Sequence, residues 1–288
     1  MYFFFMSFNN ILCFGTLNPD LIYFIDELPS QGDDIRSSSS KIRAGGTAIN
    51  CSELIVLWNK HVHVRGNSIS EDPMGIYLTN HLKKNDIQYE DVIINDTPTP
   101  TCSIFVDSTG ERTIVSSGYE NLEWSNLENL NKFDSLILDR YSIQFIKDDL
   151  KNLKNENNLF ICQAGYEYEI NYKLDFLIVS KDEIDVKKAN DLIDSETVKY
   201  ILLTSSNLPA RLISSEGNVE IVPPDFKTIN STGAGDATAA YIASFGIDDL
   251  TLTIKNACAA GAIVAGTNEK PTLEKIKEIS ALVDVNLR

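Results

Sequence analysis

The sequence predicts an α/β fold: a doubly wound, mostly parallel sheet flanked by helices, with a small β-sheet lid. Short apolar runs of strand length alternate with longer helical stretches, an order typical of parallel sheets. Two hairpin-like segments, at about residues 21–43 and 101–117, interrupt this alternation and are assigned to the lid. The 288 residues, 43% of them apolar, suffice for one large domain with such an elaboration, and we treat residues 1–288 as that domain.

The charge and the cysteines limit the classes of protein. Lys and Arg total 25 against 41 Asp and Glu, a net charge of −16, which argues against nucleic acid or an anionic membrane as the main partner. The five cysteines are scattered and fit reduced thiols in the cytoplasm. Residues 1–6 are apolar but too few to span a bilayer, and Met6 is an alternative start to Met1. We expect a cytoplasmic protein.

Strand and helix alternate in the first third of the chain. Residues 10–15 form a buried run that ends at a glycine, and residues 16–20 are predicted as the loop that leaves it. A glycine pair then starts a helix, which precedes a strand at residues 62–65. Asp72 and Pro73 are typical of a helix start.

Four segments are predicted to form the lid. Residues 21–25 and 35–43 look like one hairpin, and residues 102–106 and 112–116 look like a second. After the lid, polar helical stretches such as residues 143–154 separate apolar runs. Strands are expected at residues 135–138, 159–162, 176–179 and 200–203, an antiparallel edge at 211–214 and 219–222, and helices at 237–245, 251–265 and 272–282.

A glycine turn that runs into a helix stands out at residues 229–240. Gly233 and Gly235 allow a tight turn and leave successive N–H groups unshielded, so the start of the helix is an anion site. Asp236 would repel a bound phosphate there unless it takes a proton from an incoming hydroxyl. A phosphoryl transferase needs both groups: N–H donors that face the phosphate and a base that faces the acceptor.

The residues alone leave a second interpretation open, in which Asp236 only occupies the first helical turn and the glycines serve a tight loop. The segment is similar to the signature of the ribokinase-like, or phosphofructokinase-B-type, carbohydrate kinases, where Asp-Thr precedes a variable residue and Gly-Ala-Gly-Asp. Residues 233–236 match that core, whereas Asn230 and Ser231 replace Asp and Thr. The resemblance covers almost the whole chain and implies a lid over the sugar, with a homodimer contact through that lid.

On the sugar side, Asn18 and Asp20 follow the first strand, at the carboxyl edge where open α/β sheets bind ligands. The resemblance implies that this pair grips sugar hydroxyls, and the alternative for Asp20 is an ordinary loop acid. Residues 45–50 are similar to the family's Gly-Gly-Xaa-Ala-Xaa-Asn signature. In the family these glycines permit close approach of the sugar and the Asn bonds its hydroxyls, which implies substrate contacts for Gly45, Gly46, Thr47 and Asn50.

On the nucleotide side, residues 179–183 correspond to an acidic stretch that in the family organises water around Mg²⁺. Glu183 is retained, and Lys181 replaces an acid and is expected to contact ATP phosphate. The alternative is a solvated helix start. Where the family has a glycine-rich segment under the nucleotide, Thr204 survives, but Ser206 and Pro209 replace the glycines.

Asn256 lies in the helix that in the family flanks adenine, and on sequence alone it is a polar residue on a helix face. Further details resemble ketohexokinase, among them the Gly-Xaa-Arg-Thr-Ile-Val element at residues 110–115. Arg140, after the strand at residues 135–138, is then expected to contact the sugar or its phosphate. These details favour a ketose or furanose, fructose-like acceptor.

The leading hypothesis is an ATP-dependent kinase that phosphorylates a hydroxyl of a small sugar. Asp236 acts as the base, the N–H groups of Gly233, Ala234 and Gly235 stabilise the moving phosphoryl group, and Glu183 holds Mg²⁺ partly through water. Two rivals stay open. One is a nucleoside kinase of the same family with its base on aromatic lid residues, and the other is a degenerate protein that binds a sugar or nucleotide without catalysis.

Overall fold

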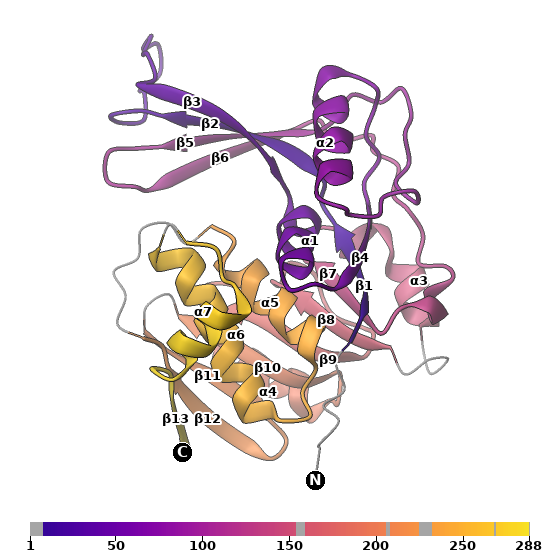
Figure 1. Ribbon diagram of the computed structural model, residues 1–288, viewed down its shortest axis with the longest axis vertical. Coiled ribbons are helices and arrows are strands. Elements are labelled where there is room, and N and C mark those ends of the chain that lie inside the picture. Colours follow the sequence, from indigo (N-terminus) through magenta and orange to yellow (C-terminus); the bar gives the residue numbers. More distant parts are fainter. Residues whose placement is uncertain (1–7, 154–158, 206–207, 225–231, 268, 288) are drawn as a thin grey trace.

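The computed structural model describes residues 8–153, 159–205, 208–224, 232–267 and 269–287. Within these residues, a nine-stranded sheet forms the large unit and a four-stranded sheet stands beside it (Figure 1). The strands of the large sheet, in spatial order, are β13 (Asp284–Leu287), β12 (Gly217–Val222), β11 (Leu208–Ser214), β10 (Val198–Ser205), β9 (Leu174–Ser180), β8 (Phe160–Ala164), β7 (Ser135–Asp139), β1 (Asn10–Gly15) and β4 (His61–Gly66).

The strands from β4 to β10 run parallel, and β11, β12 and β13 continue the sheet in antiparallel order. This confirms the predicted α/β fold and the antiparallel edge. The sequence analysis did not predict β13, a four-residue strand that pairs with β12 at the sheet edge. A segment this short carries no clear alternation of its own, so only the neighbouring strand defines it.

Helices cover both faces of the large sheet and form two separate cores. Alternation along β1 explains the division, because Ile11 and Cys13 lie in one core while Leu12 and Phe14 lie in the other. One face carries α1 (Thr47–Leu57), α2 (Pro73–Lys84), α5 (Ala234–Phe245), α6 (Leu250–Gly266) and α7 (Leu273–Ser280), and the other carries α3 (Lys147–Asn152) and α4 (Val186–Asp194).

Two helix regions show how local sequence sets the bounds. The Asp72 carboxylate accepts hydrogen bonds from the N–H groups of Met74 and Gly75, which caps α2 as predicted. The helical stretch expected over residues 143–154 is shorter, because a 3₁₀ turn, η2 (Ile143–Phe145), precedes the six-residue α3. A further 3₁₀ turn, η1 (Leu130–Lys132), leads into β7.

The small sheet has the strand order β3 (Ser39–Gly45), β2 (Asn18–Phe24), β5 (Thr101–Val106) and β6 (Arg112–Ser117). Its two antiparallel hairpins meet where β2 runs parallel to β5, which confirms a separate small sheet built from the two predicted hairpins. It stands above the end of the large unit that holds the starts of α1 and α5 (Figure 1).

One prediction about this sheet was wrong. Residues 16–20 were expected to be a loop, but Asn18 and Asp20 lie in β2, where they pair with β3. The intervening Pro19 pairs with β3 but lies before the point where β5 begins to pair with β2. The N–H that proline lacks is therefore not needed for a hydrogen bond to β5.

Among the described residues, no helix has the length and apolar character needed to cross a membrane.

Candidate active site

The order of the strands creates a crevice beside β1. From β1 the chain passes first to β4 on one side, and it later returns to β7 on the other side. At such a switch point, open α/β sheets bind ligands at the carboxyl ends of the strands. Thr16 follows β1 and Asp139 ends β7, so both lie at the carboxyl ends of the strands beside this switch point.

Asp139 is fully buried and anchors this edge. Its Oδ2 accepts hydrogen bonds from the Thr16 backbone N–H at 2.7 Å and from the Thr16 hydroxyl at 2.9 Å, and its Oδ1 accepts one from the Ser142 N–H at 2.7 Å. Burial raises the pKa of this carboxyl, and the hydrogen bonds from Thr16 and Ser142 lower it. The sequence analysis missed Asp139, although its place after a predicted strand was a usable signal.

The start of α5 has the form of an anion site. Gly233 has φ +81° in the left-handed region, where a side chain would be strained, and it lets the chain turn into the helix. Within the described residues, a Cβ on Gly235 would meet nothing within 4 Å. The first N–H groups of α5 have no intrahelical partner. The structure therefore has the predicted donors at residues 233–235.

Asp236 lies in the first turn of α5, beside the first turn of α1. Asn50 Nδ2 donates to Asp236 Oδ2 at 2.7 Å, and the Cys51 thiol donates to the Asp236 carbonyl at 3.4 Å. Burial raises the pKa of the Asp236 carboxyl to about 6, the Asn50 hydrogen bond opposes this, and the charge of Asp139 adds to it. A carboxyl with this pKa is largely ionised at neutral pH yet holds a proton well enough to act as a base.

Polar side chains at one end of the small sheet form a hydrogen-bonded group. Asn18 Nδ2 donates to Asp20 Oδ1 at 2.9 Å, and Arg43 Nη2 donates to Asp20 Oδ2 at 2.7 Å. The Tyr119 hydroxyl donates to Asn18 Oδ1 at 3.0 Å. Asn18 and Asp20 are 2% and 5% exposed, so the loop-acid alternative for Asp20 does not apply. The sequence analysis did not name Arg43 or Tyr119, which join this group through strand pairing and a distant loop.

The glycine pair between these groups is required by close packing. A Cβ on Gly45 would lie 2.4 Å from Asp20 Oδ2, and one on Gly46 would lie 2.1 Å from the Thr16 carbonyl oxygen. Gly46 also has φ +87°. Thr47 follows as the first residue of α1, and its N–H donates to the Thr16 hydroxyl at 3.3 Å. The predicted residues 18, 20 and 45–47 therefore lie close to one another, and Asn50 contacts Asp236.

Asp236 and Thr47 both line a cavity of about 600 Å³. It runs from the start of α5 along the carboxyl ends of β9 and β10 to α6. Its lining combines the anion turn with polar strand ends and an apolar wall. The lining includes Ala234, Gly235, Asp236, Asp182, Glu183, Thr204, Ile221, Gly261, Ala262 and Ala265.

Some of the residues predicted to bind the nucleotide line this cavity, and others do not. Thr204 lines it, and its hydroxyl donates to the Val179 carbonyl at 3.2 Å. Lys181 and Asn256 are not among the lining residues, and Asn256 Nδ2 instead donates to the Tyr241 hydroxyl at 2.9 Å. Ser206, Asn230 and Ser231 lie outside the described residues. Pro209 lies in β11, which pairs antiparallel with β10 in place of a glycine-rich turn.

Arg140 and Glu183 line the same cavity as an ion pair, in which Arg140 Nη1 contacts Glu183 Oε1. Glu183 Oε2 also accepts a hydrogen bond of 2.8 Å from the Ser180 N–H. Arg140 therefore lies in the wall of this cavity, and its contact with the sugar or its phosphate stays a prediction. Among the described residues, no group of three or more His, Cys, Asp or Glu is arranged to hold a metal ion.

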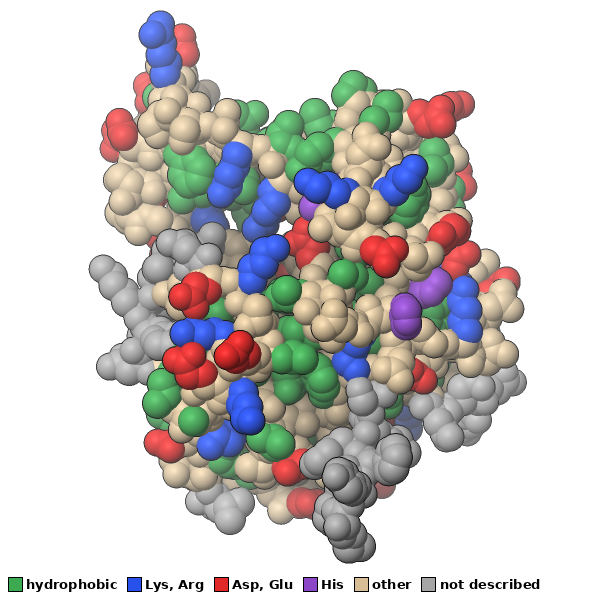
Figure 2. Space-filling model, viewed as in Figure 1, with side chains coloured by type: hydrophobic (Ala, Val, Ile, Leu, Met, Phe, Trp, Pro, Cys, Tyr) green, Lys and Arg blue, Asp and Glu red, His purple; other side chains and the backbone are tan. Residues whose placement is uncertain are grey.

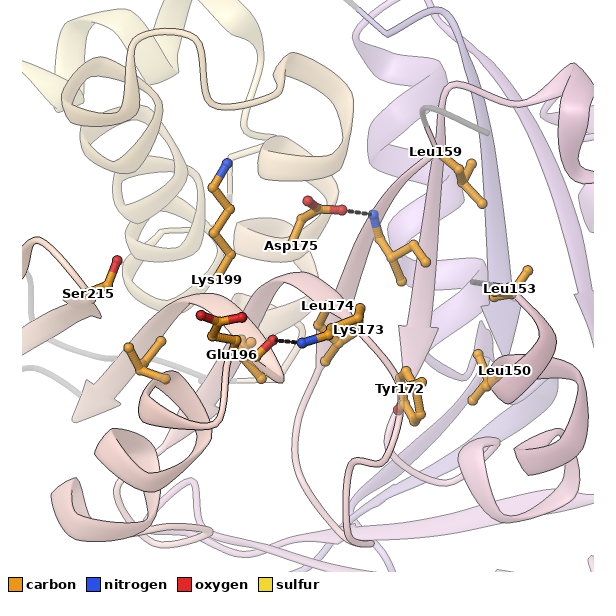
Figure 3. A pocket seen from close by; sticks show the side chains of 13 residues that line it. Leu150, Leu153, Leu159, Tyr172, Lys173, Leu174, Asp175, Glu196, Lys199 and Ser215 are labelled. Atoms are coloured by element: carbon orange, nitrogen blue, oxygen red, sulfur yellow. Dashed lines mark hydrogen bonds between the residues drawn. The ribbon is translucent and has the colours of Figure 1, made fainter. Parts of the chain in front are cut away.

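A second cavity, of about 500 Å³, lies at the amino ends of β8, β9 and β10. Figure 3 shows Leu150, Leu153 and Leu159 on one side of it and Asp175 and Lys199 on the other. Asp175 accepts a hydrogen bond of 2.9 Å from the Ile161 N–H, which uses this carboxylate to start β8. This is the sheet edge opposite Asp236, so the cavity is separate from the candidate active site.

The doubly wound sheet and the small sheet over its carboxyl edge together define the ribokinase-like fold. A family model described as pfkB family carbohydrate kinase matches residues 9–272. The chain therefore belongs to the pfkB family of carbohydrate kinases, which confirms the resemblance found in its motifs.

Individual relatives agree with this assignment. The chain is 25% identical over 201 residues to a ribokinase of Dictyostelium discoideum. That match covers 67% of this chain and 57% of the relative, so the chain spans little more than half the length of that protein.

Two solved structures show the shared fold. The ribokinase of Thermotoga maritima superposes with a TM-score of 0.78 at 18% identity, over 94% of this chain and 99% of that one. The Arabidopsis thaliana ribokinase complexed with ribose and ATP superposes with a TM-score of 0.75 at 16% identity, over 96% of this chain and 99% of that one.

Proposed function

We propose that this protein is an ATP-dependent kinase that transfers the γ-phosphoryl group to a hydroxyl of a small sugar. One observation carries the proposal: Asp236, a carboxyl with a pKa of about 6, stands in the first turn of α5, hydrogen-bonded to Asn50 and in the wall of a large cavity. The base faces the acceptor and the N–H groups face the donor, as phosphoryl transfer requires.

In this reaction Asp236 takes the proton of the acceptor hydroxyl as its oxygen attacks the γ-phosphorus and ADP leaves. The N–H groups of Gly233, Ala234 and Gly235 stabilise the charge that spreads over the phosphoryl oxygens. Asn50 orients the carboxylate through its hydrogen bond, and with Asn18 and Asp20 it offers donors and acceptors for sugar hydroxyls.

ATP occupies the 600 Å³ cavity, with its phosphates at the start of α5. Ile221, Ala262 and Ala265 give the far end an apolar wall that suits a nucleotide base. Gly261 lets α6 approach α5, since a Cβ there would lie 2.7 Å from the Thr238 hydroxyl oxygen. In this arrangement Thr204 contacts the nucleotide, whereas Lys181 and Asn256 stay at its margin.

The cavity fits a magnesium ion held mainly by phosphates and water, as is usual for this metal. Asp182 and Glu183 supply carboxylate oxygens on the cavity wall, and the pairing of Glu183 with Arg140 leaves it suited to contact through water. When bound, the ion neutralises charge on the phosphates.

The decisive experiment is an ADP-release assay with MgATP over a panel of ketoses, aldoses and nucleosides. We expect ADP release with at least one acceptor, and its loss when Asp236 is replaced by Asn. If calorimetry detected no binding of MgATP, with or without any sugar, the chain would be the degenerate binding protein instead of a kinase.

Among acceptors, we propose a furanose or ketose of fructose-like size. The nucleoside alternative relied on aromatic lid residues. Tyr23 and Phe105 stack at 5.6 Å, but alternation along β2 places them on the face opposite Asn18 and Asp20. Only Phe24 shares the face of Asp20, which weakens this alternative. Stabilisation of the protein by nucleosides and by no sugar in a thermal-shift screen would restore it.

A homodimer through the small sheet is the remaining part of the proposal. The face opposite Asp20 presents Ile42 at 46% exposure and Val115 at 54%, in line across the four strands. Covering such side chains favours association. Light scattering after size exclusion tests it: Val115→Asp should convert a dimer to a monomer, and a monomeric wild-type protein would contradict the proposal.

A further inference from the structure

Tyr119 reaches the predicted sugar side of the active site from outside the strands that form it. It follows β6, and Gly118 before it has φ +84°, a value that favours glycine. A Cβ on Gly118 would also lie only 3.3 Å from the Pro100 Cα. The chain turns toward the small sheet at this point, and the Tyr119 hydroxyl lies 3.0 Å from Asn18 Oδ1 and 3.9 Å from Cys102 Sγ.

These contacts place the Tyr119 hydroxyl on the face of the small sheet that carries Asp20. Cys102 in β5 pairs with Asp20 in β2, and paired residues share a face. Asn18 lies two residues before Asp20 and therefore on the same face. A Cβ on Gly46, the residue before α1, would lie 3.0 Å from Asn18 Oδ1, so this face points toward the large unit. Figure 2 shows a hollow between the small sheet and that unit.

The chemistry of its neighbours fixes the orientation of the Asn18 amide. Asp20 forms an ion pair with Arg43, and a carboxylate only accepts hydrogen bonds, so the Asn18 nitrogen must face Asp20. It donates to Asp20 Oδ1 at 2.9 Å. The amide oxygen then faces Tyr119, whose hydroxyl donates to it. Burial raises the pKa of this hydroxyl, so it keeps its proton at neutral pH and remains a donor.

This orientation leaves one donor of the Asn18 amide for a ligand. The nitrogen carries two hydrogens, one of which goes to Asp20, and the described residues supply no second acceptor for it. Asn18 is almost fully buried, and a buried donor without an acceptor costs free energy. A hydroxyl of a neutral sugar supplies such an acceptor.

We propose that Tyr119 is a positioning residue for the acceptor: its hydroxyl holds the Asn18 amide so that the remaining N–H meets one hydroxyl of the sugar. The inference rests on the proposed kinase function, in which Asn18 and Asp20 bind the sugar. Tyr119 acts through Asn18 and takes no part in the transfer, which remains with Asp236. Loss of the Tyr119 hydroxyl leaves Asn18 Oδ1 without its donor and the amide free to rotate.

The test measures ADP release by wild type and Tyr119→Phe with fructose, ribose and the monodeoxy analogues of each sugar. Tyr119→Phe removes one oxygen atom and keeps the ring. Tyr77→Phe is the matched control, because the Tyr77 hydroxyl also donates to the small sheet, at 3.4 Å to the Ile42 carbonyl, but Tyr77 lies on α2. Tyr119→Met, which lacks the hydroxyl as well, repeats the test should Tyr119→Phe fail to fold.

We expect Tyr119→Phe to raise KM for the acceptor by about tenfold, while kcat and KM for ATP stay within about twofold of wild type. With the wild-type protein, one monodeoxy analogue should have a KM about tenfold above that of its parent, because it lacks the hydroxyl that meets Asn18. This penalty should largely disappear in Tyr119→Phe. A general loss of structure would weaken all the analogues alike, and Tyr77→Phe should behave as wild type.

A double-mutant cycle tests whether Tyr119 acts through Asn18. Asn18→Ala should raise KM for the acceptor, and the further change Tyr119→Phe should raise it no more. Three results would overturn the inference: an unchanged KM for the acceptor in Tyr119→Phe, an undiminished penalty of the deoxy analogue, or additive effects of the two substitutions.

Calorimetry with the same sugars needs no turnover and so separates this inference from the kinase function. If no sugar gives ADP but a sugar binds and Tyr119→Phe weakens its binding as described, the kinase function fails and the role of Tyr119 stands. If sugars are phosphorylated and Tyr119→Phe binds them as wild type does, the function stands and the role of Tyr119 fails. If none of the sugars binds the wild-type protein, the role of Tyr119 fails as well.

Discussion

Asn50 and Asp236 are 186 positions apart in sequence, yet Asn50 Nδ2 donates to Asp236 Oδ2 at 2.7 Å. The contact joins the first turns of α1 and α5, which both begin after a glycine with positive φ. It links the sugar-side signature to the proposed base. The hydrogen bond favours the ionised carboxylate, against the effect of burial, and so helps to keep this carboxyl ionised at neutral pH.

Asp236→Asn should lower kcat by about 10²- to 10⁴-fold, because an amide cannot accept the proton of the acceptor hydroxyl. The ADP-release assay measures this directly. Asp148→Asn is the matched control, since Asp148 also lies in a first helical turn, that of α3, but is 93% exposed. Near-normal turnover of Asp236→Asn on its best acceptor would show that another group is the base.

The same substitution should stabilise the fold at alkaline pH. The Asp236 pKa is raised from 3.8 to about 6, so the folded state prefers the protonated form. The stability that this preference contributes is fully present below the pKa of Asp236 in the unfolded state. It is lost as the pH rises through the pKa of Asp236 in the folded state. At pH 8 the cost is at most about 3 kcal/mol, which Asp236→Asn removes. Urea unfolding at pH 8 and pH 4 checks this, and an equal gain at both pH values would contradict it.

The pH profile should report the Asp236 carboxyl. We expect kcat/KM to fall as pH drops below about 6, because the protonated carboxyl cannot act as a base. Asn50→Ala removes the hydrogen bond that lowers this pKa, so the acidic limb should move to higher pH. Weaker sugar binding would lower kcat/KM without moving the acidic limb of the pH profile, so the position of this limb distinguishes the two effects. An unmoved limb would mean that Asn50 does not act on the base.

Asp139→Ala should destabilise the protein by about 2 to 4 kcal/mol, because it leaves the buried N–H groups of Thr16 and Ser142 without their acceptor. Asp139→Asn keeps a side-chain acceptor and should cost less. Urea denaturation of the two variants gives the difference. Equal stability of Asp139→Ala and wild type would show that these hydrogen bonds do not hold the strand edge together.

Gly45→Ala should raise KM for the acceptor by about tenfold and leave KM for ATP unchanged. The added methyl would lie 2.4 Å from Asp20 Oδ2, so Asp20 must move away from its partners Arg43 and Asn18. Ser40→Ala, on the opposite face of β3, is the control. A matching rise in KM for ATP would indicate a general disturbance instead.

Local sequence patterns were sufficient for most of the fold. Alternating and continuous apolar runs predicted the strands of both sheets, except β13, within a few residues, because burial imposes a period on each element. The ends of a strand were predicted less well where pairing with a neighbouring strand decides them. β2 begins at Asn18 because β3 extends to Gly45 opposite it, a relationship that no window of sequence contains.

Some parts of the candidate active site could be predicted from local sequence, and others depend on contacts between distant residues. The glycine signatures located Gly46, Asn50, Gly233 and Asp236, because close backbone approach restricts which residues fit. The sequence did not predict the ion pair of Arg140 with Glu183, because the direction of a side chain after a strand depends on its partner.

Local patterns in the sequence were enough to predict the alternation of strands and helices and the glycine turns, since each depends on residues within one turn or strand. Only the tertiary structure decided which charges meet. Strand register brings Arg43 to Asp20, burial raises the pKa of Asp236, and the switch point places Asp139 under the site. Electrostatic energy depends on distance and desolvation, and both are properties of the folded chain.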